Sequence, residues 1–391
     1  MKKFFQLVTM AAMASTAGLS VVPSLDAAGG IATANSWPMH RGGPELLGVA
    51  PGKLSSKLTT IWKFKTEDPV VSSAAIADGR VYVGSLNGKI YALDFKTGKK
   101  IWELETEGPI ESSPLVLDGK VYVGSSDGFL YAIDAKSGKQ VWKFETQDKI
   151  LGGPNWMKAP DGKGNWIIIG SYDFLLYAVD AETGKQVWNY ESGNYINGSA
   201  AVSDGKTVFG GCDALLHVIG LKDGSQLKEI DAEAYIAGSA AVTGGRVYVG
   251  HYENVFLCVD IVKGEIAWRY DKSRFPYYAS PAVTADRVIT GGRDKRVHCL
   301  DRKTGKLIWK FATRGKVDSS PVVVDGKVVF GSEDGLVYMI SEKDGEELWN
   351  YEIGAAVTAS PAVADEVVVI GADDGTVYAF GPKQKQAKAN P

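Results

Sequence analysis

The chain has 391 residues, enough for one large repeat domain or two ordinary ones, and its 46 glycines fit an all-β protein with many tight turns. A net charge of −3 excludes a strong general attraction to nucleic acid or to anionic membranes. The three cysteines, Cys212, Cys258 and Cys299, are too few and too far apart for a disulfide framework or a zinc site.

Residues 1–28 have the pattern of a secretory signal peptide. Two lysines open the segment, and residues 4–22 are mostly apolar with polar interruptions, which favours a cleaved signal over a permanent anchor. Cleavage after any of three alanines fits: Ala17, Ala27 or Ala34. We expect an exported protein of the periplasm, the cell envelope or the medium. No other segment is long and apolar enough to be expected to span a membrane. A lipidated N-terminal cysteine is not expected either, because no cysteine occurs before Cys212.

Residues 29–57 are predicted to be a lead-in segment, and a unit of about 40 residues then repeats over residues 58–381. In the first copy, four short apolar or alternating segments are expected to be antiparallel strands: residues 70–77, 80–85, 89–94 and 99–105. Tight turns separate them at Asp78-Gly79, Asn87-Gly88 and Thr97-Gly98. Asn-Gly is the pair that favours a type I′ hairpin, in which both central residues have positive φ.

A tryptophan near the end of the fourth strand marks most copies. Seven recur, at spacings of 40, 40, 46, 80, 41 and 40 residues: Trp62, Trp102, Trp142, Trp188, Trp268, Trp309 and Trp349. The step of 80 marks one lost tryptophan, where Leu227-Lys228 stands. We predict that each tryptophan packs against the neighbouring unit beside its Thr-Gly turn, and that the junction without one is the weakest.

The fold expected from these units is an eight-bladed β-propeller of four-stranded antiparallel blades, because stacking in a ring buries both faces of each sheet. First strands and third strands number eight, but only seven fourth strands follow their own third strand. Residues 61–64 supply the missing one, so the N-terminal strand should pair into the last blade and close the ring. Residues 382–391 are expected to be a flexible basic tail, and the propeller a monomer.

Most repeated polar residues have a structural interpretation. Serines that recur before each first strand belong to the repeat, and aspartates such as Asp127 recur at hairpin turns. His217 and His298 stand where the first copy has Tyr91, which predicts packing roles for both. No catalytic constellation of side chains stands out.

The segment from Ala92 to Trp102, ALDFKTGKKIW, resembles the tryptophan-docking repeat of quinoprotein-type (PQQ-like) propellers. That superfamily contains quinoprotein alcohol dehydrogenases and the non-enzymatic BamB family of outer-membrane protein assembly factors. The lead-in from Trp37 to Gly42 also resembles that of BamB-like propellers. The dehydrogenases hold PQQ with a tryptophan floor, a disulfide between adjacent cysteines and calcium ligands. This chain has no adjacent cysteines, so the resemblance implies no catalytic residue, cofactor or metal.

Blades three to six depart from the repeat at two places, the start of the first strand and the end of the second. Antiparallel geometry puts both at the same end of a blade, so the changes should converge on one part of one face. Tyrosine, histidine and arginine are typical anchors of protein interfaces. The candidate partner-binding residues are Tyr172, Tyr195, Asn197, Tyr235, His251, Tyr252, Tyr277, Tyr278 and Arg293. Blade three also carries six extra residues near 160–165, at the opposite face.

The expected function is that of a non-enzymatic exported scaffold that binds a cell-envelope protein or an extended polypeptide, as BamB-like propellers do in outer-membrane protein assembly. Strand addition is one mode of binding. Two alternatives stay open: a dehydrogenase that uses PQQ with calcium, and a secreted module that binds carbohydrate or another small ligand on the tyrosines. Nucleic acid is not expected as a partner.

Overall fold

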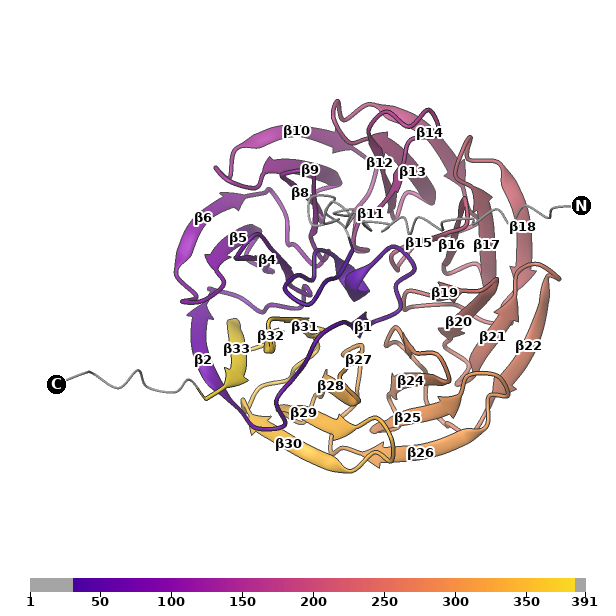
Figure 1. Ribbon diagram of the computed structural model, residues 1–391. Coiled ribbons are helices and arrows are strands. Elements are labelled where there is room, and N and C mark those ends of the chain that lie inside the picture. The colour runs from indigo at the N-terminus through magenta and orange to yellow at the C-terminus, as the bar shows by residue number, and fades with distance from the viewer. Residues whose placement is uncertain (1–30, 384–391) are drawn as a thin grey trace, which may run out of the picture.

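The computed structural model describes residues 31–383 and shows eight four-stranded blades arranged in a ring (Figure 1). The predicted all-β, eight-bladed propeller is therefore confirmed. The expected signal peptide, residues 1–28, and residues 384–391 of the expected tail lie outside the described residues. Within the described part of the chain, no helix is long and apolar enough to cross a bilayer.

The first four blades follow the chain in order, each with four consecutive strands. Blade one comprises β3 (Ala75–Ala77), β4 (Arg80–Gly84), β5 (Lys89–Asp94) and β6 (Lys100–Glu105). Blade two comprises β7 (Leu115–Leu117), β8 (Lys120–Gly124), β9 (Phe129–Asp134) and β10 (Gln140–Glu145). Blade three comprises β11 (Asn155–Lys158), β12 (Asn165–Gly170), β13 (Leu175–Asp180) and β14 (Gln186–Glu191). Blade four comprises β15 (Ala201–Ser203), β16 (Lys206–Gly210), β17 (Leu215–Gly220) and β18 (Gln226–Asp231).

The last four blades include two strands from the N-terminal part of the chain. Blade five comprises β19 (Ala241–Thr243), β20 (Arg246–Gly250), β21 (Phe256–Asp260) and β22 (Glu265–Tyr270). Blade six comprises β23 (Ala282–Val283), β24 (Arg287–Gly292), β25 (Arg296–Asp301) and β26 (Leu307–Ala312). Blade seven comprises β27 (Val322–Val324), β28 (Lys327–Gly331), β29 (Leu336–Ser341) and β30 (Glu347–Glu352), with β1 (Val49–Ala50) added beside β27. Blade eight comprises β31 (Ala362–Ala364), β32 (Val367–Ala372), β33 (Thr376–Pro382) and β2 (Leu58–Lys65).

Two local predictions need correction. The first strand of blade one covers only β3, not residues 70–77, because Ser72 and Ser73 turn toward the ring axis and bond to the next blade instead. The Asn87-Gly88 turn is not type I′, since only Gly88 has positive φ. Its loop has three residues with a left-handed glycine, and Gly88 donates to the Ser85 carbonyl. The two positive φ angles of type I′ occur instead at Asp78 and Gly79.

The ring closes as predicted. β2 pairs antiparallel with β33, from Leu58 opposite Pro382 to Lys65 opposite Thr376. The last blade is thus built from both ends of the described chain. The edges of β2 and β33 that face each other are both paired.

Tryptophan docking is also confirmed. In each case the indole N–H donates to a backbone carbonyl of the next blade, at 2.8–3.3 Å: Trp62 to Phe95, Trp102 to Ala135, Trp142 to Ala181, Trp188 to Leu221, Trp268 to Arg302, Trp309 to Glu342 and Trp349 to Leu58. The ring lies against the turn glycine: a Cβ on Gly98 would come within 2.5 Å of Trp62. Where the tryptophan is lost, the Lys228 ammonium donates to the carbonyl of Val262, one residue beyond the position that a tryptophan would bind. That junction has a hydrogen bond to the next blade but no indole ring.

The recurring serines form a belt around the axis, as their structural interpretation predicted. The backbone N–H of one serine donates to the hydroxyl of the next blade's serine, at 2.9–3.2 Å: Ser73 to Ser113, Ser199 to Ser239, Ser239 to Ser280, Ser280 to Ser320 and Ser320 to Ser360. These hydroxyls hold neighbouring blades in register, so none of them is a free nucleophile.

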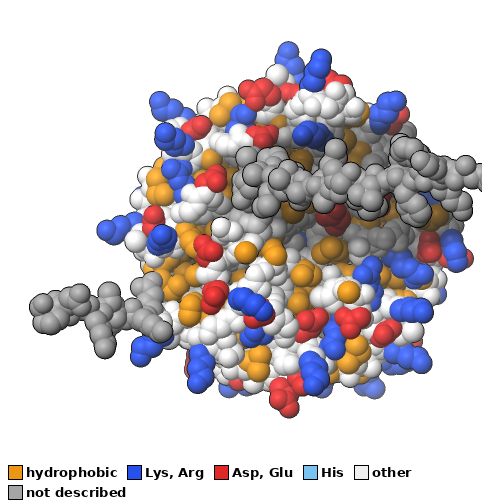
Figure 2. Space-filling model, viewed as in Figure 1, with side chains coloured by type: hydrophobic (Ala, Val, Ile, Leu, Met, Phe, Trp, Pro, Cys, Tyr) orange, Lys and Arg blue, Asp and Glu red, His pale blue; other side chains and the backbone are white. Residues whose placement is uncertain are grey.

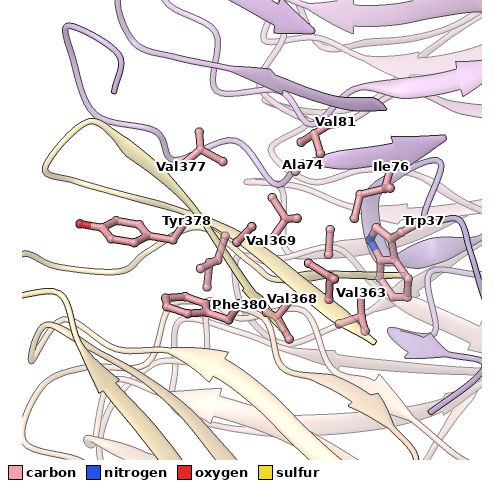
Figure 3. Packing of buried hydrophobic residues seen from close by; sticks show 14 of the residues in the cluster. Trp37, Ala74, Ile76, Val81, Val363, Val368, Val369, Val377, Tyr378 and Phe380 are labelled. Carbon is pink, nitrogen blue, oxygen red and sulfur yellow. The ribbon is translucent and has the colours of Figure 1, made fainter. Parts of the chain in front are cut away.

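The lead-in segment crosses the centre of the ring and plugs it (Figure 1, indigo). Its backbone bonds to the inner strand of blades one to seven and to the turn after the inner strand of blade eight. The pairs are Trp37 with Ile76, Pro38 with Val116, Pro44 with Asn155 and Val202, Glu45 with Val242, Leu47 with Val283, Gly48 with Val323, and Ala34 with Asp365. Inner strands have unpaired N–H groups at the axis, and this segment pairs one in nearly every blade. Figure 3 shows Trp37 packed beside Ile76 and Val363.

Arg41 is the middle residue of the short η1 turn (His40–Gly42) in this plug. Its buried guanidinium donates to the carbonyls of Pro281, Ser320 and Pro321 at 2.9, 3.1 and 2.7 Å. Burial lowers the pKa of Arg41 to about 9, so it keeps its charge at neutral pH. On the plugged face, side chains of both charge signs are interspersed around the rim (Figure 2). The part of the surface seen in this view therefore carries no large patch of one charge sign.

Candidate functional site

The two variable places of the repeat do lie at the same end of the blades. The N–H of Tyr172 donates to Lys149, that of Tyr252 to Tyr235 and that of Arg293 to Pro276, at 3.0, 2.9 and 3.2 Å. Each bond joins the end of a second strand to the segment before the first strand of the same blade. This end is opposite the Asp-Gly turns, and we call it the arc face.

Six of the predicted residues lie along this face in two contacting groups, which together we call the tyrosine arc: Tyr172 with Tyr195, and Tyr235 with Tyr252, Tyr278 and Arg293. Rings from adjacent blades touch: the centroids of Tyr172 and Tyr195 are 4.7 Å apart and stacked, and those of Tyr252 and Tyr278 are 4.8 Å apart. Tyr235 meets Tyr252 edge-on at 6.4 Å. The exposed fractions of Tyr235, Tyr195 and Tyr252 are 52%, 41% and 39%. The arc therefore offers large aromatic area that is already held in place.

Both ends of the arc carry a cation. The Arg293 guanidinium lies 3.4 Å from the centroid of Tyr278, and the Lys149 ammonium lies 4.5 Å from that of Tyr172. Arg293 also binds both carboxylate oxygens of Asp318 in blade seven, at 2.7–3.1 Å. This fork fixes the guanidinium plane over the ring.

Two hydroxyls of the arc have a raised pKa and are therefore neutral at physiological pH. A hydrogen bond with Tyr278, together with burial, raises the pKa of Tyr252 to about 12. Burial likewise raises the pKa of Tyr172. Neutral phenols can donate and accept hydrogen bonds, which suits recognition of backbone amides or hydroxyl groups.

Two predicted residues are not available at the surface, and the expectation that they contact a partner is corrected. Tyr277 is fully buried, with its ring 5.8 Å from Phe256 and 5.6 Å from His298. His251 is buried too, and its Nδ1 accepts a hydrogen bond from the Glu253 N–H at 3.0 Å. Burial lowers the pKa of His251, which keeps this nitrogen an acceptor. Both residues pack beneath the arc and support it.

Asn197 connects the arc to the ring axis. Its side-chain amide donates to the Cys212 sulfur at 3.0 Å and to the Ile236 carbonyl at 3.2 Å, so it bridges blades four and five. It also lines a hollow of about 190 Å³ at the axis, together with Tyr278. The arc and this axial hollow therefore form one continuous surface.

The plug supplies the floor of the axial hollow. His40 lines it, opposite Glu111 and the glycines and serines of the belt. Burial and the charge of Arg41 lower the pKa of His40 to about 3, so the imidazole is neutral. His40, Glu111 and Asp318 were not among the sequence candidates. One aligned position of the repeat includes the last two, and its members in blades one to six line the hollow: Val71, Glu111, Leu151, Asn197, Ala237 and Tyr278. Asp318 and Thr358 hold the same position in blades seven and eight.

The histidines at the Tyr91 position are packing variants, as predicted. His217 and His298 are buried, and each contacts its turn aspartate, Asp213 or Asp294, at 2.8 and 3.0 Å. In the regular blades a tyrosine hydroxyl makes this contact, as Tyr131 does with Asp127 at 2.7 Å.

A quinone site with calcium does not fit the axial hollow. Its lining contains no tryptophan and no cysteine. All three cysteines are free, and burial raises the pKa of the Cys299 thiol to about 12. Across residues 31–383, no three side chains of His, Cys, Asp or Glu come together as a metal site. The lining of the axial hollow therefore lacks the tryptophan and the cysteine pair that the resemblance to quinoprotein dehydrogenases would lead one to expect there.

Solved structures share this architecture. BamB from Moraxella catarrhalis is 18% identical, with a TM-score of 0.70 over 83% of this chain and 100% of that chain. Quinohemoprotein alcohol dehydrogenase from Comamonas testosteroni is 16% identical, with a TM-score of 0.76 over 91% and 82%. The computationally designed Ika8 protein is 18% identical, with a TM-score of 0.73 over 83% and 99%. Identities this low show the common fold alone.

A comparison with curated proteins gave no match. The family model described as outer membrane protein assembly factor BamB matches residues 57–170, 172–279 and 274–389. These three segments cover the propeller almost from end to end. The chain therefore belongs to the BamB family.

Proposed function

We propose that this protein is a non-enzymatic scaffold of the cell envelope that binds a protein partner or an extended polypeptide through the tyrosine arc, in outer-membrane protein assembly. Membership of the BamB family supports the cellular process. The observation that carries the binding role is the arc itself, which presents three exposed tyrosines, each in contact with the ring of another arc tyrosine, in two groups across blades three to six.

The arc has the properties of a preorganised protein-binding surface. Tyrosine brings large contact area with only two side-chain torsions to restrict, and ring contacts already restrict them before binding. The Arg293 fork and the neutral phenols add directional hydrogen bonding. Because the arc runs along several blades, it suits an elongated partner such as a strand or an extended loop.

No specific observation favours a PQQ-dependent dehydrogenase, because the lining of the axial hollow contains no tryptophan and no cysteine. We therefore expect no dye-linked alcohol oxidation after the exported protein is supplied with PQQ and calcium. Robust turnover in that assay would overturn the scaffold proposal.

Site-specific photocrosslinking in the cell envelope tests the binding role. A photoreactive residue at Tyr235 or Tyr252 should capture a specific envelope protein. The matched control is Ile101, which has a similar exposed fraction but lies on the outer strand of blade one. Equal products from Ile101 and the arc positions, or none from either arc position, would contradict the proposal.

A further inference from the structure

The junction between blades four and five keeps a seat for a tryptophan but holds no tryptophan. At six other junctions the indole lies on a turn glycine, and a Cβ on that glycine would come within 2.5–2.9 Å of the ring. The carbonyl that accepts the indole N–H belongs to the residue three positions before that glycine, as Phe95 precedes Gly98. In blade five the equivalent pair is Ile261 and Gly264, and Lys228 of β18 stands where the tryptophan would be. We call this pair the vacant seat.

The vacant seat is open to solvent. Gly264 is exposed, whereas the six glycines that carry an indole are buried or half-buried: Gly98, Gly138, Gly184, Gly224, Gly305 and Gly345. Within 4 Å of a Cβ placed on Gly264, the described residues put only the Nζ and Cδ atoms of Lys228, at 3.4 and 3.7 Å. Lys228 is itself exposed, and its ammonium donates to the Val262 carbonyl. No side chain of residues 31–383 donates to the Ile261 carbonyl.

The surface beside the seat has become apolar. Val262 lies between Ile261 and Gly264 in the same turn and is 75% exposed, the largest value among the exposed large hydrophobic side chains of the described chain. The other blades with this turn have a charged residue at the position of Val262: Lys96, Lys136, Glu182, Lys222, Lys303 and Lys343. The loss of the tryptophan is therefore accompanied by a gain of open apolar surface at the same junction, which is typical of an interaction site.

We propose that the vacant seat binds a tryptophan side chain of a partner polypeptide. The docked tryptophans of the other junctions show which group this backbone frame holds, a flat ring over the glycine with its N–H on the carbonyl. A phenyl ring or an acyl chain would cover the Ile261 carbonyl without giving it a donor, which is unfavourable. Lys228 can move aside, because its stem follows the surface while its ammonium stays in water.

The vacant seat is separate from the tyrosine arc. The Ile261 N–H donates to the Gly245 carbonyl at 3.0 Å, in the turn between the first and second strands of blade five. Turns of that kind lie at the end of the blade opposite the arc face. A partner could therefore occupy the seat while the arc is free, and either site could be lost without the other.

Saturation-transfer difference NMR on the full exported protein tests this inference. The probe is N-acetyl-tryptophanamide, which carries the indole between two amide groups, and a single docked ring should bind it with a Kd of about 1 mM. N-acetyl-leucinamide should give no signal at the same concentration. Lys228→Trp fills the seat from within the chain, so it should abolish the signal and raise the melting temperature. Lys228→Ala uncovers the seat and should keep the signal or strengthen it.

The matched control is Val141→Trp, which places a tryptophan at an exposed position of the outer strand of blade two and should leave the signal unchanged. Equal signals from the two probes, or none from either, would overturn the inference. So would a wild-type signal from folded Lys228→Trp, or a lost signal from folded Lys228→Ala. Loss of the signal on placing serine at both Tyr235 and Tyr252 would put the probe on the arc instead. None of these results affects the photocrosslinking test of the arc.

Discussion

The two halves of the arc face use the same backbone in different ways. In blades seven and eight, the residues at the end of the second strand are acidic and are paired locally: Glu333 lies 3.3 Å from Lys316, and Asp373 accepts from Thr358 at 2.9 Å. In blades three and five the equivalent residues are Tyr172 and Tyr252, which contact rings of neighbouring segments and remain partly open to solvent.

This difference shows where the repeat is free to change. Each blade junction has at least one of two devices, a docked tryptophan or a serine–serine bond of the belt. The side chains above the belt are not needed for closure, so they can change from short, locally paired groups to an aromatic surface. Function in a repeat fold therefore resides in sites grafted onto an unchanged frame.

The largest effect is expected from breaking the closure that both halves share. Deletion of residues 58–66 removes β2 from blade eight and leaves the edge of β33 unpaired. We expect loss of the cooperative unfolding transition, measured by thermal melting under circular dichroism. A deletion variant with the wild-type melting temperature would show that the ring does not depend on this strand.

A junction of the regular blades and the junction between blades four and five should differ in how much they stabilise the fold. Trp102→Ala in the regular half removes a buried ring and should lower the free energy of unfolding by about 3–5 kcal/mol. Lys228→Ala, at the junction that has lost its tryptophan, removes only a partly exposed donor and should cost about 1 kcal/mol. Urea denaturation gives both values. Equal costs would contradict the view that this junction is already weakened.

Much of the frame could be predicted from sequence because its devices leave side-chain signatures. The period, the docking tryptophans and the strand at residues 61–64 all specify the ring. The plug left little signal, because the lead-in binds the blades through backbone carbonyls such as Pro38 and Gly48, which any residue possesses. Its crossing of the axis therefore became visible only in three dimensions.

At the arc, the variable positions lie at one end of the blades as the sequence predicted, but two of the candidate side chains are buried. Tyr277 belongs to a repeat position that is buried in all eight blades, with Val70, Ile110, Ile150, Ile196, Ile236, Val317 and Val357. One extra residue before the first strand of blade six obscured this alignment, because the belt serines are 41 residues apart there and 40 apart in the preceding blade. His251 likewise takes a position that holds the buried Ser85 and Ser125 in regular blades. Alignment within the repeat separates such supporting residues from exposed ones.

The arc itself should affect binding far more than stability. The double variant Tyr235→Ser with Tyr252→Ser removes two exposed rings, and a central interface tyrosine typically contributes about 2 kcal/mol, or roughly 30-fold in Kd. Thermal melting should change little, because neither ring is core. The partner captured by photocrosslinking, purified and titrated against wild type and variant, gives the measurement. Ile101→Ser is the control, and equal affinities would remove the arc from the interface.

The smallest expected effect concerns the ion pairs that tie the plug to the regular half. Hydrogen bonds from Lys53 and Lys327 hold the pKa of Asp325 at about 2, below its ordinary value of 3.8. A carboxyl whose pKa is lower in the folded state stabilises the fold above pH 4, and this contribution disappears as the pH falls through about 2. Asp325→Asn should therefore cost at most about 1 kcal/mol at pH 7 after screening by solvent, and nothing near pH 2.

The matched control for this pH dependence is Asp204→Asn, at the same turn position of blade four, where no lysine of the lead-in is bonded to the carboxylate. Urea denaturation of both variants between pH 2 and pH 7 separates the two cases. A cost for Asp325→Asn that stays constant over this range would show that the turn, rather than the charge, holds the plug. A cost that disappears with acid, and only for Asp325, would assign the ion pairs the role of fastening the lead-in to blade seven.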